Sequence, residues 1–176
     1  MGIQRFLAAS AALLVSGCVI QVAPPTPASS PAPTNVTERP SAYGATEARI
    51  FDLINAERQH QGLPALAYSS RLDRMAKIQA TNMARLHKMA HTLPESATPT
   101  LGSRAQLVGY PFGRLTENVA LGYPNAPTVV QGWMNSSGHR HNILDAGVVE
   151  TGIGIARGSD GGLYYCQVFG KQLASL

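Results

Sequence analysis

A proline-rich segment divides the chain and limits how much of it can fold. Residues 19–44 hold six of the twelve prolines, with alanine, serine and threonine between them. Proline lacks a backbone N–H, and this segment has too little apolar surface to form a core, so it predicts an extended tether. A folded domain is therefore expected only in residues 45–176, which are enough for one hydrophobic core.

The amino-terminal residues are typical of a secretory signal. Arg5 precedes an apolar run from Phe6 to Val15, and the run closes on small residues. The run is too short to cross a bilayer as a helix, because a spanning helix takes roughly 20 residues. We interpret residues 1–17 as a signal peptide.

A single cysteine stands where the apolar run ends. Residues 15–18 read Val-Ser-Gly-Cys, which resembles a bacterial lipobox, in which the signal is cut before the cysteine. Acyl chains on Cys18, palmitate among them, would then anchor the tether of residues 18–44 to a membrane. The alternative is an ordinary signal peptide with a cysteine there by chance.

We expect the protein to associate with a membrane and not with a nucleic acid. The 14 Lys and Arg residues against 10 Asp and Glu give a net charge of +4, but they form no run that could follow a phosphate backbone. Val19, after the lipidated cysteine, is not the aspartate that retains lipoproteins at the inner membrane of many two-membrane bacteria. We expect a cell-envelope location, at the outer membrane where the host has two.

Apolar residues recur at steps of three and four in three stretches of the domain, which predicts amphipathic helices. Ser70 and Asp73 resemble a capping box at the start of the second helix. Residues 91–102 are rich in turn formers and predict no element. The helices are expected from Thr46 to the stop at Gly62, from Ser70 to about Ala90, and from Asn125 to about Ser136.

The carboxyl-terminal part changes to strand-like patterning. Residues 152–156 and 163–169 flank a glycine-rich turn at 158–162, which predicts an antiparallel hairpin. A further strand is expected at residues 118–121. Helices followed by a hairpin, without repeated βαβ units, indicate an α+β fold with helices packed on a small antiparallel sheet.

Short motifs along the domain resemble those of a known family. In order, they are Asn55-Ala56-Glu57-Arg58, His91-Thr92, Glu117-Asn118-Val119-Ala120, residues 132–140, Asn142-Ile143-Leu144, Thr151-Gly152-Ile153-Gly154 and Gln167-Val168-Phe169-Gly170. The set resembles the bacterial branch of the CAP superfamily, which comprises cysteine-rich secretory proteins, antigen 5 and pathogenesis-related 1 proteins and whose domain is also called SCP. The resemblance covers residues 45–172. It implies an α-β-α sandwich with a surface cleft in a secreted or surface-tethered protein.

The resemblance also implies which side chains line the cleft: His91, Glu117 and His139. Two neutral imidazoles can ligate a divalent metal such as zinc, with His91 and His139 as the metal ligands and a carboxylate holding the metal's water. No other cofactor is indicated. The ligand expected in such a cleft is a small lipid, a glycan or a peptide.

Two functions remain open for this cleft. One is a binding or interaction module of the cell envelope. The other is a metal-assisted hydrolase of peptides or cell-wall material, with Glu117 as its only catalytic candidate. Catalytic zinc normally has three protein ligands, and the second glutamate of the animal and plant branch is absent from Met134-Asn135-Ser136, so the sequence favours binding.

Each residue also has a purely structural interpretation. The two cleft histidines could be helix-end histidines satisfied by backbone groups, and Glu117 could tie a loop to backbone amides. Trp133 shares an apolar stripe and is expected in the core. Cys166 lies inside a predicted strand and is expected to be a buried free thiol, whereas His141 is expected to be exposed. Thr116 stands where the family usually has glycine, which excludes a freely positive φ there.

Overall fold

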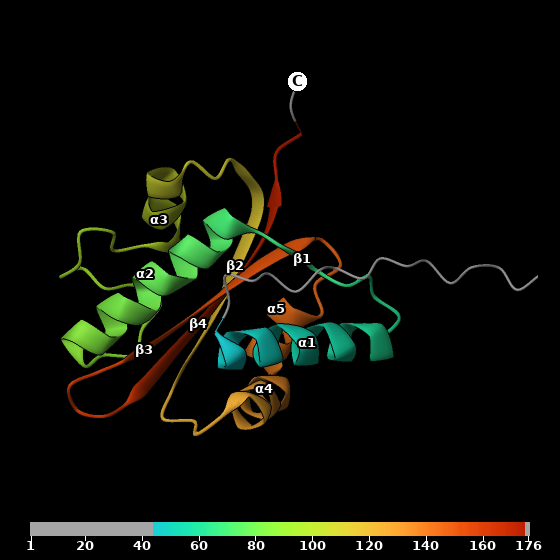
Figure 1. The fold of residues 1–176 in the computed structure, drawn as a ribbon. Helices are drawn as coiled ribbons and strands as arrows, with labels where there is room; N and C mark the ends of the chain where they lie inside the picture. The colour runs from blue at the N-terminus through green and yellow to red at the C-terminus, as the bar shows by residue number, and fades with distance from the viewer. Residues whose placement is uncertain (1–43, 175–176) are drawn as a thin grey trace, which may run out of the picture. The chain divides into compact units, whose positions relative to one another are not determined.

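The computed structural model describes residues 44–174 (Figure 1). The predicted signal peptide, Cys18 and the proline-rich tether lie outside these residues. Within them the chain forms five helices and four strands. In chain order these are α1 (Ala45–His60), β1 (Ala67–Tyr68), α2 (Ser70–Leu86), α3 (Leu101–Val108), β2 (Phe112–Leu121), α4 (Ala126–Asn135), α5 (Ser137–Ile143), β3 (Glu150–Arg157) and β4 (Leu163–Gln172).

The four strands form one sheet in the order β1-β3-β4-β2. The predicted hairpin of β3 and β4 is confirmed, and β2 pairs antiparallel with the other side of β4. The two-residue strand β1, which the sequence did not indicate, pairs parallel with β3. The sheet is therefore mixed, and the predicted α+β class with helices packed on a small sheet is confirmed.

Helices cover both faces of the sheet (Figure 1). Alternate residues of β4 point to opposite faces: Tyr165 and Phe169 join the core with α1 and α4, while Cys166 and Val168 join the core under α2 and α3. Trp133 on α4 is 1% exposed, which confirms its place in the first of these cores. The described part of the chain is thus an α-β-α sandwich.

Two glycines of β3 allow α2 to lie directly on the sheet. A Cβ built on Gly152 would lie 1.9 Å from the backbone nitrogen of Asp73, and one on Gly154 would lie 2.4 Å from the carbonyl carbon of Ala76. Only a residue without a side chain permits this approach of helix backbone to strand backbone. The contact sets the height of α2 above the sheet.

The end of α2 differs from the prediction. The helix stops at Leu86 rather than near Ala90, because His87 takes a left-handed conformation with φ 49° and closes the helix. The following residues then run as an irregular loop. The predicted capping box at Ser70 and Asp73 is wrong, since Ser69 is the N-cap and its side chain makes no capping hydrogen bond.

A capping box does occur in the chain, at the start of α3. The Thr100 side chain accepts a hydrogen bond from the Ser103 backbone N–H at 3.0 Å, and the Ser103 hydroxyl accepts one from the Thr100 backbone N–H at 3.0 Å. These reciprocal bonds satisfy donors that would otherwise lack partners at a helix start. They stabilise the start of a helix that the sequence did not predict, just where the turn-rich stretch of residues 91–102 ends.

The elements α4 and β2 agree in type with the prediction, whereas α5 is a short helix that the sequence did not predict. The α4 helix begins after Asn125, whose side-chain oxygen accepts a hydrogen bond from the Thr128 N–H at 3.1 Å. Thr116 lies within β2, opposite Phe169, where no positive φ is needed, so its replacement of glycine is compatible with the strand. Every helix in residues 44–174 is too short or too polar to cross a membrane.

Candidate functional site

The site forms around β2, the strand at one edge of the sheet. Neighbouring residues of a strand face opposite sides, so Glu117 and Asn118 serve different layers. Glu117 contacts the α2 and α3 layer through Arg104, and Asn118 contacts α5 through the backbone of His139. Segments from both layers therefore meet at this edge.

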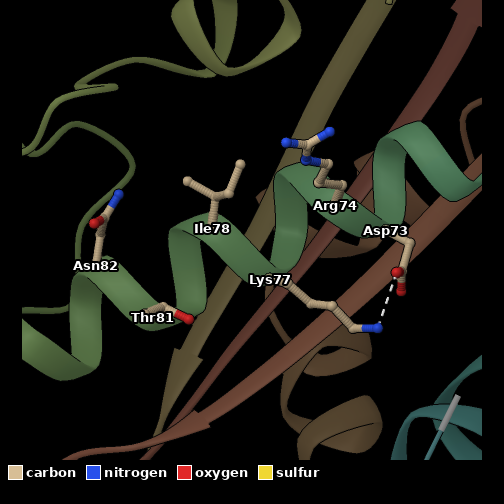
Figure 2. A pocket seen from close by; sticks show the side chains of 6 residues that line it. All are labelled: Asp73, Arg74, Lys77, Ile78, Thr81 and Asn82. Atoms are coloured by element: carbon tan, nitrogen blue, oxygen red, sulfur yellow. Dashed lines mark ion pairs between the residues drawn. The ribbon is translucent and has the colours of Figure 1, made fainter. Parts of the chain in front are cut away.

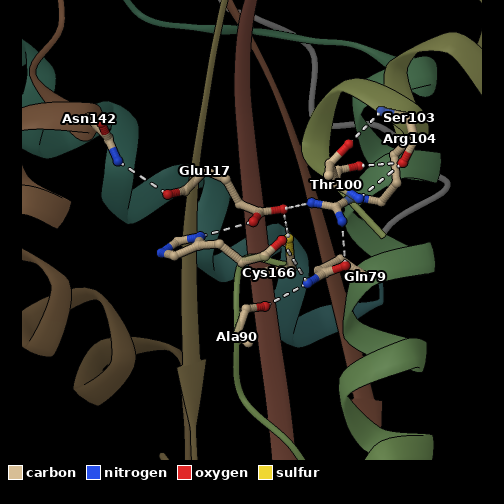
Figure 3. A network of polar contacts seen from close by, with 9 residues as sticks. Gln79, Ala90, Thr100, Ser103, Arg104, Glu117, Asn142 and Cys166 are labelled. Carbon is tan, nitrogen blue, oxygen red and sulfur yellow. Dashed lines mark hydrogen bonds and ion pairs between the residues drawn. The ribbon is translucent and has the colours of Figure 1, made fainter. Parts of the chain in front are cut away.

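The Glu117 carboxylate has three partners. Its Oε2 accepts hydrogen bonds from Arg104 Nη2 and, at 3.3 Å, from the Cys166 thiol. Its Oε1 lies 3.0 Å from Nδ1 of His91. Figure 3 shows the carboxylate between Arg104 and Cys166, with Gln79 of α2 beside Arg104. The Glu117 side chain is 2% exposed and the His91 side chain 57%, so the pair joins the interior to the surface.

Arg104 and Gln79 hold this arrangement from beneath. Arg104 is fully buried, and its Nη1 donates to Oε1 of Gln79. The Gln79 amide nitrogen donates in turn to the carbonyl of Ala90 at 2.6 Å and to that of His91 at 3.4 Å. The loop that carries His91 is thus attached to α2 by the same network that binds the Glu117 carboxylate.

Two asparagines fix the backbone around His139, the other predicted cleft histidine. The Asn118 amide nitrogen donates to the carbonyl of His139 at 3.1 Å. The Asn142 amide nitrogen donates to the carbonyl of Glu117 at 3.1 Å and to Oδ1 of Asn118 at 2.9 Å. These bonds attach α5 to β2, which brings His139 to the same edge as His91.

The two histidines differ in their pKa values. The hydrogen bond to Glu117 raises the pKa of His91 above its usual value, although burial opposes the change. Partial burial lowers the pKa of His139, and the charge of His91 lowers it further. The charge of His91 thus acts on His139, whereas the pKa of His91 is set by Glu117, burial and Arg104. At neutral pH His139 is neutral, which is the form that binds metals.

The structure brings the three predicted residues together, with one correction. His91 contacts Glu117 directly, and His139 lies near His91. Glu117 was expected to line a surface cleft, but its carboxylate is buried against a buried arginine. The partners of the Glu117 carboxylate are side chains, and not the backbone amides that the purely structural interpretation of this residue predicted.

Other predicted residues lie as expected, and several site residues had not been predicted. Cys166 is a buried free thiol, and burial raises its pKa well above the usual range. His141 is exposed. Arg104 and Gln79 were missed, although the Thr100 and Ser103 spacing was a signal for the helix that carries Arg104.

The donors available to a metal at this site are few. In residues 44–174 no three His, Cys, Asp or Glu side chains converge so as to hold an ion. Both oxygens of Glu117 already accept hydrogen bonds, which leaves the two imidazoles. Two imidazoles, in their neutral form, fit loose binding of a divalent ion, for which a proton on His91 competes, and they are one ligand short of the usual catalytic zinc site.

A separate hollow of about 440 Å³ lies along the outer face of α2 (Figure 2). The side chains around it include Ile78 and an ion pair between Lys77 and Asp73 at 3.0 Å. None of the three predicted site residues lines it. We therefore assign no role to this hollow.

Comparison with known sequences identifies relatives of the whole domain. The model of the Cysteine-rich secretory protein family, CAP, matches residues 51–169. The uncharacterized protein YkwD of Bacillus subtilis is 32% identical over 148 residues, which are 82% of this chain and 55% of YkwD. The chain thus spans about half the length of this relative.

Solved structures share the fold. An extracellular protein containing an SCP domain from Bacillus anthracis is 31% identical with a TM-score of 0.65, over 72% of this chain and 40% of that one. An outer surface protein of Borrelia burgdorferi is 22% identical with a TM-score of 0.64, over 70% of this chain and 90% of that one. A structure of NaASP2 with Zn²⁺ is 13% identical with a TM-score of 0.52, over 76% of this chain and 84% of that one.

Proposed function

Because the chain belongs to the cysteine-rich secretory protein family, we propose that it is a binding module of the cell envelope whose ligand contacts His91 and His139. The ligand is a divalent cation or a small polar molecule that offers a group to the two imidazoles. The extracellular SCP-domain protein of Bacillus anthracis, at 31% identity, supports a location outside the cytoplasm.

One observation carries the proposal: the contact between His91 and Glu117. In neutral His91, Nδ1–H donates to the carboxylate, so Nε2 carries the free lone pair. A carboxylate behind an imidazole sets the tautomer and increases the basicity of the outer nitrogen, as in many metal-ligating histidines. The half-exposed ring is therefore prepared to bind a ligand and not merely packed.

The role of Glu117 in this proposal is to orient His91. A metal bound by the two histidines would supply a positive charge that attracts an anionic or polar group. The alternative of a metal-assisted hydrolase requires Glu117 to take a proton from water. Its carboxylate is instead buried and bonded to Arg104, Cys166 and His91, so no observation favours that alternative.

Zinc titration tests the proposal. The full chain carrying Cys18→Ser is titrated with zinc chloride in a calorimeter, alongside His91→Ala and His139→Ala. His141→Ala is the matched control, because this histidine lies on the same helix as His139 and is exposed. We expect binding in the parent and control chains, loss in the two variants, and weaker binding as pH falls through the histidine range near 6.5.

Absence of zinc binding in the parent chain contradicts the cation proposal, as does undiminished binding in both variants. A protease and muramidase assay on the same samples addresses the hydrolase alternative. Activity that requires Glu117 and zinc would favour that alternative over a binding module.

We also propose that acyl chains on Cys18 hold the protein at a membrane, the outer one where the host has two. The support is the sequence Val-Ser-Gly-Cys at residues 15–18 and the valine that follows. Replacing Cys18 by serine should move the protein from the membrane fraction to the soluble fraction. Unchanged membrane fractionation of Cys18→Ser would overturn the lipid anchor.

A further inference from the structure

A histidine outside the site described above is bound by the turn between β3 and β4. His87 follows the last residue of α2, and its Nδ1 lies 3.1 Å from Oδ2 of Asp160. Its Nε2 lies 3.1 Å from the hydroxyl oxygen of Ser159, 72 positions away in the chain. We propose that Ser159, His87 and Asp160 form an esterase-type triad with Ser159 as the nucleophile. This site is independent of the proposed function at His91 and His139.

The three contacts have the order that such a triad requires. A nucleophile must bond to one nitrogen of the base, and an orienting carboxylate must bond to the other. In the neutral tautomer with its proton on Nδ1, His87 donates to Asp160, and the Ser159 hydroxyl donates to Nε2. The carboxylate thereby selects the tautomer in which Nε2 can take the serine proton.

Asp160 is itself held in place. Its Oδ1 accepts from the Gly162 N–H at 2.9 Å, and its Oδ2 accepts from the Tyr164 hydroxyl at 2.9 Å. The Gly162 N–H, followed by the Tyr164 hydroxyl, lowers the pKa of Asp160, so the carboxylate stays ionised at neutral pH. An ionised, fixed carboxylate is what orients a catalytic imidazole.

The backbone on both sides is shaped around this contact. His87 is the only non-glycine residue with a positive φ in residues 44–174. This conformation ends α2, and the ring at this helix end contacts the turn between β3 and β4. On the other side, a Cβ on Gly158 would lie 2.3 Å from Oδ1 of Asp160, so a glycine is needed for the carboxylate to occupy its position.

A pocket of about 340 Å³ adjoins the serine and the histidine. Ala84 and Ala156 contribute small apolar side chains, and Arg85 and Arg157 contribute positive charge. Such a lining suits a small ester that carries a carboxylate or another anionic group.

The turn also offers donors for a developing negative charge. Among the described residues, no acceptor bonds to the backbone N–H groups of Ser159 and Asp160. The N–H of the nucleophile itself is part of the oxyanion hole in serine hydrolases. These two groups are the donors we assign to that role.

The reaction is a hydrolysis with water as the second substrate. The Ser159 oxygen forms a bond to the ester carbonyl carbon, and its proton moves to Nε2 of His87. The bond to the alcohol oxygen breaks, and the alcohol leaves with that proton. Water then gives a proton to Nε2 of His87, and the water oxygen forms a bond to the acyl carbon. The bond between that carbon and the Ser159 oxygen breaks, the acid leaves, and the proton passes from His87 to the Ser159 oxygen.

Labelling with a fluorophosphonate tests the triad. In this reaction the Ser159 oxygen bonds to phosphorus and fluoride leaves, while His87 takes the proton. The full chain carrying Cys18→Ser is incubated with the probe, and the adduct is located by peptide mass spectrometry. We expect an adduct on Ser159. We also expect the chain to hydrolyse 4-nitrophenyl hydrogen succinate, and Arg85→Ala should slow this hydrolysis more than it slows the hydrolysis of 4-nitrophenyl acetate.

The variants separate chemistry from folding. His87→Asn is chosen because asparagine tolerates the left-handed conformation, and Asp160→Asn because it keeps the shape of the side chain. Each should lower the labelling rate at least about 100-fold, the usual contribution of a general base and its orienting group. Ser137→Ala and His141→Ala, which change an exposed serine and histidine on α5, are the controls and should label as the parent does.

The proposal is overturned if the parent chain gains no adduct at Ser159. It is also overturned if His87→Asn labels at the parent rate, because Ser159 would then react without a base. Circular dichroism of each variant tests whether its helices are retained. If His87→Asn unfolds, the labelling rate of Asp160→Asn decides instead, and a rate equal to that of the parent overturns the proposal.

Discussion

Replacing Glu117 by glutamine should destabilise the domain strongly. The change keeps the size of the side chain and removes the charge opposite the guanidinium of Arg104, which is fully buried. Arg104 has Glu117 as its ion-pair partner and Gln79 as a neutral one, and its Nε has no hydrogen-bond partner among the described residues. The variant therefore leaves a buried positive charge without compensation.

The expected loss is about 3–5 kcal/mol of unfolding free energy, the usual result of removing one partner of a buried ion pair. Domains of this size have a total of about 5–15 kcal/mol, so the midpoint of thermal unfolding should fall by about 10–20 °C. Glu95→Gln is the matched control. It makes the same chemical change in the exposed pair with Lys88 and should leave the midpoint of unfolding close to that of the parent.

A double-mutant cycle identifies the cause. Arg104→Met alone leaves the Glu117 carboxylate buried and should also destabilise. The combination of Arg104→Met with Glu117→Gln removes both charges and should lie closer to the parent than the sum of the single changes. Urea unfolding of the full chain with Cys18→Ser can be followed by the fluorescence of Trp133, the sole tryptophan. A parent-like midpoint for Glu117→Gln, or simple additivity in the cycle, would refute the reasoning.

Four further predictions concern titration and packing. In an NMR titration the His91 imidazole should have a pKa above about 6.5 and that of His139 a pKa below it. The raised pKa of His91 contributes stability to the folded state that is present below about pH 6.5 and is lost as pH rises through the pKa of the folded state. His91→Gln should therefore remove this pH dependence from the urea midpoints measured across that range. Gly152→Ala places a Cβ 1.9 Å from helix backbone and should cost about 3 kcal/mol in urea unfolding, whereas Gly138→Ala, with nothing within 4 Å, should stabilise by up to about 1 kcal/mol. Trp133→Ala should cost about 3–5 kcal/mol, and an unchanged melting temperature would show that the side chain is not part of the core.

Local patterns were sufficient for much of the fold. The helices α1, α2 and α4 and the hairpin of β3 and β4 follow from apolar residues at steps of three and four or of two. These patterns work because each element buries one stripe or one face. The predicted strand at 118–121 was too short, since β2 begins at Phe112 with residues that are mostly exposed and give no alternation.

Elements that depend on neighbours were missed. Strand β1 has two residues and exists through its pairing with β3. Helix α3 buries Arg104 and Ala105, and an inward-facing arginine breaks the apolar stripe that would have predicted it. The helix α2 ends at His87, and the ring of His87 contacts the turn after β3. The helix thus ends where it meets a segment that is distant in the sequence.

For the site, the sequence by itself determined the residue types and, through the family motifs, that His91, Glu117 and His139 belong to one region. Only the tertiary structure decided how they differ. Glu117 and Asn118 are adjacent in the chain, but a strand directs them to opposite layers. Burial beside Arg104 turns the glutamate from an exposed base into a fixed support for His91. That outcome depends on the low polarity of the surroundings and on partners 13 and 26 positions away, which no local pattern encodes.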